Sequence, residues 1–189
     1  MTATAGPERP SWGAAKPVSE EGLSKILASF DGSAEKLTVA QDTPVLRVVS
    51  GKLQDLARFL RDDPDLQFGQ LVLVTGVHWP GRESDFEVIY QLRSLARGLE
   101  LELKVLLKGP DPEVPTLCGV WPGADWLERE TYDLVGIRFA GHPDLRRILM
   151  AEGTLGHPLR KDHPRRAPKF SMRRSEHEGT PDLLEKSPG

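Results

Sequence analysis

Cysteine, aromatic residues and long apolar runs are all scarce in this chain of 189 residues. The single cysteine, Cys118, excludes an internal disulfide framework. One thiol also cannot supply the several thiolates that an iron–sulfur cluster or a structural zinc site takes. The sequence contains no GxGxxG motif and no GxxxxGKS or GxxxxGKT motif. We therefore expect no cluster, flavin or nucleotide to be held by this chain.

Membrane-spanning and secretory signals are also lacking. The longest strongly apolar stretch, residues 71–77, is interrupted by Thr75 and Gly76, and it is far shorter than the ~20 residues that cross a bilayer. The first 18 residues contain no apolar core of signal-peptide length and only two basic residues. We expect a bacterial protein on the cytoplasmic side, without a membrane span of its own.

The charges are distributed unevenly. Residues 1–141 hold 15 Lys and Arg against 21 Asp and Glu, a net charge of −6, whereas residues 142–174 hold 9 against 3, a net charge of +6. We call residues 142–174 the basic strap. A segment of this kind can meet nucleic acid, anionic lipid or an acidic protein surface.

Two amphipathic helices are predicted in the first third of the chain. Ser19 is placed to cap the first, which carries apolar residues at helical spacing over 23–30 and stops at the Asp-Gly pair 31–32. The second carries an apolar stripe over 53–60 and ends before Pro64. Each of these helices has one apolar face to bury.

Strand patterns alternate with and follow these helices. Residues 45–49 predict a short strand, and the nearly unbroken apolar run 71–79 predicts a central strand buried on both faces. Apolar and polar residues alternate over 86–92 and again over 99–107, with a short turn at Gly98 between them, which predicts an antiparallel pair. The expected fold class is α+β, a single mixed or antiparallel sheet with helices packed on one face, followed by an extended C-terminal strap.

The chain therefore divides into four expected parts. A flexible N-terminal arm covers residues 1–18, and an α+β domain covers 19–120. A helix and interface strap follow at 121–164, and 165–189 form a tail that is disordered or ordered by a partner.

Charged residues dominate the predicted helix that starts this third part. Asp125 is placed as an N-cap, Glu128 completes a capping box, and Gly136 is a natural stop. Arg129 stands four residues before Asp133, a spacing that allows a local ion pair. On spacing alone, a solvated charged helix face explains these residues.

The same segment resembles the 30-kDa subunit family of respiratory complex I, the proton-translocating NADH:quinone oxidoreductase. The family signature runs E-R-E, two residues, an acidic residue, two apolar residues, six residues, His or Lys, three residues, a basic residue or Pro, one residue, and two apolar residues. Every position is matched here, by Glu128-Arg129-Glu130, Asp133, Leu134-Val135, His142, Arg146 and Ile148-Leu149. Residues 156–164, GHPLRKDHP, resemble a second family box, with His163 where an aromatic residue is usual.

The resemblance implies a cofactor-free subunit of the hydrophilic arm, peripheral on the cytoplasmic side of the bacterial cell membrane. It also implies packing against the hydrogenase-large-subunit-like chain at the quinone pocket, which we call the quinone-site subunit. FMN and iron–sulfur clusters are then expected on partner subunits, and NADH and quinone are substrates of the whole translocase. We expect no catalytic, cofactor-binding or metal-binding residue on this chain. The expected partner-interface residues are Glu128, Arg129, Glu130, Asp133, His142, Arg146, Arg147, His157, Arg160 and Lys161.

Other functions remain open at this point. The equivalent subunit of a membrane-bound nickel–iron hydrogenase, or of another electron-input version of the complex, is a close alternative. A nucleic-acid-binding protein that uses the basic strap is an alternative of another class, although aromatic residues for base stacking are sparse there. A zinc hydrolase built on His142, His157 and His163 is disfavoured, because their spacings match no helical ligand pair and each precedes a proline.

Overall fold

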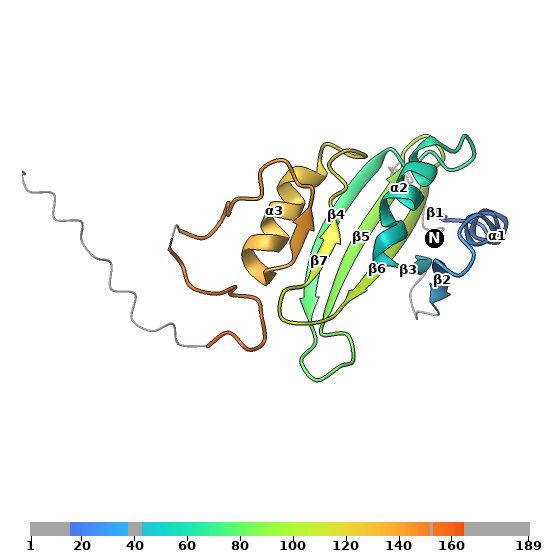
Figure 1. The fold of residues 1–189 in the computed structure, drawn as a ribbon. Coiled ribbons are helices and arrows are strands. Elements are labelled where there is room, and N and C mark those ends of the chain that lie inside the picture. The colour runs from blue at the N-terminus through green and yellow to red at the C-terminus, as the bar shows by residue number, and fades with distance from the viewer. Residues whose placement is uncertain (1–15, 38–42, 152, 165–189) are drawn as a thin grey trace, which may run out of the picture.

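The structure, a computed structural model, describes residues 16–37, 43–151 and 153–164. A mixed sheet forms its centre, with the strand order β2-β3-β6-β5-β4 and a short strand β1 beside β6 (Figure 1). Two further strands, β7 and β8, pair in a small parallel sheet. The strands are β1 (Lys16–Pro17), β2 (Ala34–Leu37), β3 (Val45–Val48), β4 (Gln70–His78), β5 (Phe86–Ser94), β6 (Leu99–Leu107), β7 (Glu113–Pro115) and β8 (Arg138–Ala140).

The predicted antiparallel pair forms the middle of the sheet. β5 and β6 pair in register along their whole length, from Phe86 opposite Leu107 to Ser94 opposite Leu99. The turn between them contains Gly98 at φ 64°, a left-handed conformation that favours glycine. Every second side chain is buried on one face, which is the alternation that the sequence shows.

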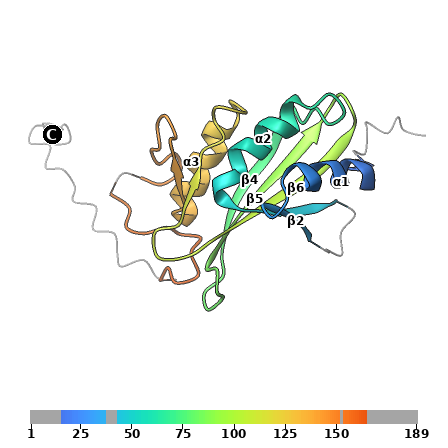
Figure 2. The same cartoon turned by 45° about the vertical axis from the view of Figure 1, so that its right-hand side comes forward.

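The helices cover a single face of this sheet. They are α1 (Glu20–Ser29), α2 (Leu53–Asp62), which follows the 3-10 turn η1 (Ser50–Lys52), and α3 (Ala124–Val135). Ser19 caps α1 by accepting a hydrogen bond from the Gly22 N–H at 3.2 Å, as predicted. The buried side chains of all three helices join those of β5 and β6 in one hydrophobic core, and Figures 1 and 2 show α1 and α2 side by side on the sheet. The α+β prediction is confirmed.

The prediction that residues 71–79 form a central strand buried on both faces is wrong. β4 is an edge strand of the sheet, paired with β5, and its Val72 and Leu73 side chains are exposed. A continuous apolar run does not reveal where a strand lies in a sheet. Here the core face of β4 packs against α3, and Gly76 allows the close approach, because a Cβ there would lie 2.7 Å from Ile137 Cδ1.

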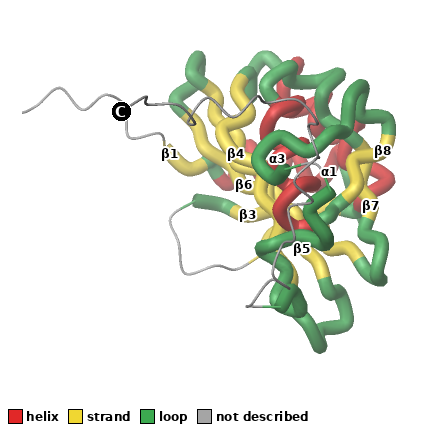
Figure 3. The backbone as a smooth tube through the Cα atoms, turned by 90° about the vertical axis from the view of Figure 1, so that its left-hand side faces the viewer, coloured by secondary structure: helices red, strands yellow, loops and turns green. Residues whose placement is uncertain are grey.

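The described part of the basic strap, residues 142–151 and 153–164, contains no helix or strand. In Figure 3 the chain beyond β8 is drawn as loop. No helix in the described ranges is long and apolar enough to cross a membrane. The predicted tail, residues 165–189, and all but the end of the predicted arm lie outside the described residues.

Candidate partner interface

Helix α3 carries the acidic signature and is held firmly on the sheet. The Thr131 hydroxyl donates a hydrogen bond to the Val74 carbonyl of β4 at 3.3 Å. Gly136 ends the helix at φ 80°, with its N–H bonded to the Tyr132 carbonyl at 2.9 Å. The orientation of every side chain on α3 follows from this placement.

Glu128 points into the protein instead of capping the helix. The helix begins at Ala124 with Gly123 as its N-cap and no side-chain cap, so the predicted capping box is wrong. The fully buried Glu128 carboxylate accepts hydrogen bonds from the Leu117 N–H at 2.7 Å and from the Thr116 hydroxyl at 2.5 Å. Burial raises the pKa of Glu128 in spite of these two donors. This carboxylate fixes the loop between β7 and α3.

Cys118, Glu128 and His142 form one polar cluster, with their potential ligand atoms within 4.8 Å of one another, and within the described ranges it is the one group that could hold a metal ion. The geometry favours hydrogen bonds over a metal. His142 Nδ1 accepts a hydrogen bond from the Asp144 N–H at 3.0 Å, so the ring proton lies on Nε2. Burial raises the pKa of the Cys118 thiol to about 11, which keeps it protonated near neutral pH.

Asp133 is also buried, and it holds the basic strap. Its Oδ2 atom accepts hydrogen bonds from three consecutive backbone N–H groups, residues 148–150, at 3.1, 2.8 and 2.8 Å. Its Oδ1 atom lies 3.2 Å from Arg147 Nη1, so the predicted pairing of Asp133 with Arg129 is wrong. Burial alone would raise the pKa of Asp133, but the three N–H groups and the Arg147 guanidinium hold this pKa below its usual value.

The end of the strap closes over the C-terminus of α3. The Arg160 Nε–H donates to the Val135 carbonyl at 2.7 Å, where the helix leaves carbonyls without internal partners. His157 Nδ1 lies 2.9 Å from the Asp133 carbonyl, and burial lowers the pKa of this imidazole. The Lys161 N–H donates to His78 Nδ1 of β4 at 3.1 Å. The strap is therefore bonded to both α3 and the sheet.

Arg129 lies between the buried carboxylates and the outer surface of α3. Its Nε–H donates to the Arg146 carbonyl at 3.2 Å, and its guanidinium lies 5.2 Å from the centroid of the Trp126 ring. Trp126 is 63% exposed, and Glu130, four residues further along the helix, is exposed as well. The outward face of α3 thus presents an aromatic ring beside charges of both signs.

The ten residues expected at a partner interface therefore occupy two kinds of position. Six are buried or partly buried and bond within the chain, namely Glu128, Asp133, His142, Arg147, His157 and Arg160. Glu130, Arg146 and Lys161 are exposed, and Arg129 is partly exposed. Sequence reasoning missed the exposed apolar side chains beside them, whose only signal was their position in a segment without a core of its own. They are Trp126, Leu149, Leu155 and Leu159.

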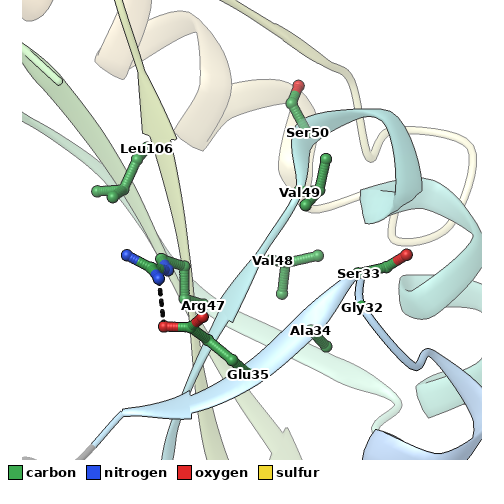
Figure 4. A pocket seen from close by; sticks show the side chains of 9 residues that line it. All are labelled: Gly32, Ser33, Ala34, Glu35, Arg47, Val48, Val49, Ser50 and Leu106. Carbon is green, nitrogen blue, oxygen red and sulfur yellow. Dashed lines mark ion pairs between the residues drawn. The ribbon is translucent and has the colours of Figure 1, made fainter.

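A separate groove of about 510 Å³ lies at the other end of the sheet, between the start of β2 and the end of β3 (Figure 4). Its charged side chains, Arg47 and Glu35, form an ion pair with each other. The remaining lining comes from small and apolar residues, such as Val49 and Leu106. This groove lacks a nucleophile or an acid–base pair and does not resemble an active site.

Comparison with known proteins identifies the family. Residues 46–169 match the family described as respiratory-chain NADH dehydrogenase, 30 Kd subunit, and this match spans β3 to the basic strap. The chain belongs to this family. The predicted resemblance is confirmed.

Curated relatives carry the same assignment, since each is named as the corresponding subunit of NADH-quinone oxidoreductase. The relative from Xanthobacter autotrophicus is 45% identical over 139 residues, covering 74% of this chain and 66% of the relative. The relative from a Roseiflexus species is 53% identical over 113 residues, covering 60% of this chain and 65% of the relative. The chain thus spans just under two-thirds of the length of these relatives.

Two solved structures share the fold of this member of the 30 Kd family. One, described as Nqo5 of the trypsin-resistant fragment (1-134), is 27% identical with a TM-score of 0.56, covering 67% of this chain and 98% of that chain. The other belongs to the membrane-bound sulfane sulfur reductase, an archaeal respiratory membrane complex, and is 26% identical with a TM-score of 0.56, covering 65% of this chain and 71% of that chain.

Proposed function

We propose that this chain is a cofactor-free subunit of the peripheral arm of a proton-translocating NADH:quinone oxidoreductase. It supports assembly of the complex and holds the quinone-site subunit in place during electron transfer from NADH to quinone. The observation that carries the proposal is the arrangement of the family signature, whose buried carboxylates fold the basic strap onto α3 and leave an apolar and charged surface outside.

The outer surface of α3 and the strap has the composition of a protein interface. Exposed Trp126 and the strap leucines supply apolar contacts, and an aromatic ring beside an arginine is the pairing that most often dominates binding energy. The net charge of +6 on the basic strap favours an acidic partner surface. In this proposal the quinone-site subunit provides that surface.

The role of the chain is architectural because its reactive groups are engaged in holding the fold. The Cys118 thiol is protonated, and Glu128 is bonded to the loop that it anchors. Electron carriers therefore belong to partner subunits, and the chain reaches the cytoplasmic face of the membrane through the complex.

A related complex with another electron input is a second candidate. The likeness to a subunit of a sulfane sulfur reductase supports it, and a membrane-bound nickel–iron hydrogenase is of the same kind. A gene for a flavin- and NADH-binding subunit beside the gene for this chain would favour the first proposal.

Nucleic-acid binding through the basic strap is less well supported. Two of the arginines that it would use, Arg147 and Arg160, are bonded to Asp133 and to the carbonyls that end α3. Neither guanidinium is therefore fully available for a phosphate, whereas a protein partner can use the apolar side chains beside them.

The test is to tag the chain in its host, solubilise the membranes in mild detergent and identify what co-purifies by mass spectrometry. The quinone-site subunit and the flavin-binding subunit, in stoichiometric amounts, are expected. A variant in which Trp126 and Leu149 are both changed to serine should lose these partners, while a matched control with Val72 and Leu73 changed to serine on β4 should keep them. Recovery of nucleic acid without respiratory subunits would contradict the proposal.

A further inference from the structure

The basic strap lacks the features that normally give a segment one conformation. Its described residues form no helix or strand, and several of its large apolar side chains, such as Leu149 and Leu155, are exposed instead of packed in a core. A chain of this composition would have to lose much conformational entropy on meeting a partner, at a cost to affinity. In spite of this, residues 146–150 follow a defined path along α3.

One carboxylate accounts for this path. Asp133 accepts three successive N–H groups on a single oxygen and contacts Arg147 with the other, and its side chain is fully buried. Charged hydrogen bonds of this kind are the stronger ones in proteins, and a carboxylate that loses them leaves buried groups without partners. The contacts join one position of α3 to four consecutive residues of the strap.

We propose that Asp133 is a positioning residue, a latch that sets the basic strap in its partner-binding conformation before the partner arrives. The inference rests on the proposed function and adds to it a division of labour within the signature. The buried carboxylate sets the shape, and the exposed side chains of α3 and the strap make the contact. On this view Asp133 need not touch the partner at all.

Asp144 provides a matched control within the same segment. It also carries a carboxylate that pairs with a strap arginine, since its two oxygens lie 2.7 to 3.0 Å from Arg146 nitrogens. However, its side chain is 44% exposed and binds no run of backbone N–H groups. Asp144→Asn and Asp133→Asn thus remove the same charge from neighbouring arginine pairs, but only Asp133→Asn opens the latch.

The first measurement uses the purified full-length chain without a partner. Trypsin cleavage after Arg146 and Arg147 is followed by mass spectrometry, because cleavage reports how often the strap leaves α3. Asp133→Asn should raise this cleavage rate by about tenfold or more, the factor expected for the loss of a charged hydrogen bond. Asp144→Asn should stay within about twofold of the wild type, and cleavage within the sheet domain should not change in either variant.

Hydrogen exchange gives a second readout if Asp133→Asn folds poorly. In the wild-type chain the amides of residues 148–150 should exchange at least about tenfold more slowly than free amides, although they lie in a loop. Exchange at the free-amide rate, or an Asp133→Asn cleavage rate equal to that of the wild type, would overturn the latch.

Co-purification then separates this inference from the function on which it rests. If the wild-type chain binds the quinone-site subunit and Asp133→Asn binds it at least about tenfold more weakly, both hold. If Asp133→Asn opens the strap but binds this partner as tightly as the wild type, presetting is refuted and the function stands. If the wild-type chain does not bind the quinone-site subunit, the proposed function fails, while proteolysis still decides whether Asp133 holds the strap.

Discussion

Replacing Glu128 with alanine tests whether the signature carboxylate supports the fold. In the structure Glu128 binds the Leu117 N–H and the Thr116 hydroxyl, both in buried residues. Glu128→Ala leaves these two groups without their acceptor, at ~1–3 kcal/mol each. We therefore expect the free energy of unfolding of the isolated chain to fall by ~2–5 kcal/mol, whereas a solvated helix face would lose only ~0–1 kcal/mol.

The pH dependence of the same variants isolates the charge. Burial raises the pKa of Glu128, so the folded chain holds this proton to higher pH than the unfolded chain does. The wild type should therefore lose stability relative to Glu128→Gln as the pH rises through the raised pKa. Below the ordinary carboxyl pKa, where both states are protonated, the advantage of the wild type is complete.

The assay is urea unfolding of the isolated chain, followed by tryptophan fluorescence at several pH values between about 4 and 8, which bracket the ordinary carboxyl pKa and its raised value. Thr116→Val is a useful companion, because it removes one of the two donors and should cost less than Glu128→Ala. An unfolding free energy of Glu128→Ala within about 1 kcal/mol of the wild type would refute the buried role of this carboxylate.

Three further outcomes follow from the same structure. Arg129→Met should change the stability of the isolated chain by only ~0–1 kcal/mol but lower the amount of assembled oxidoreductase in membranes, with turnover per complex unchanged; unchanged assembly would contradict this, and Cys118→Ser serves as the control. Gly76→Ala should destabilise the chain by ~1–3 kcal/mol in urea unfolding, since the new methyl meets α3, and a neutral result would show that the helix can move away. Truncation after Gly141 should leave a cooperatively unfolding sheet domain that no longer co-purifies with the quinone-site subunit, and full recovery of that partner would contradict an interface on the strap.

The sequence predicts the parts of the fold that depend on local periodicity. The alternation over β5 and β6, the Ser19 cap and the apolar stripe of α2 all lead to the observed elements. The position of β4 could not be predicted, because an edge strand packed against a helix and a central strand can have the same apolar composition.

The site was predictable as a location but not as a set of contacts. The signature places Glu128, Asp133 and His142 in one segment, yet helical spacing suggested a cap for the first and an Arg129 partner for the second. Both carboxylates instead bind backbone groups outside α3, at residue 117 and at residues 148–150. Such long-range backbone acceptance leaves no periodic trace in a sequence, which is why it required the folded chain.

The edge position of β4 has a consequence for how this protein behaves when its strap is missing. An apolar strand at the margin of a sheet is a template on which another chain can add a strand. In this molecule α3 bonds to β4 at Val74, and the strap bonds to it at His78. Removal of the strap withdraws the second of these covers and brings the truncated chain closer to strand exchange and aggregation during expression. The strap then also acts as a built-in guard of solubility for copies that have not yet met a partner.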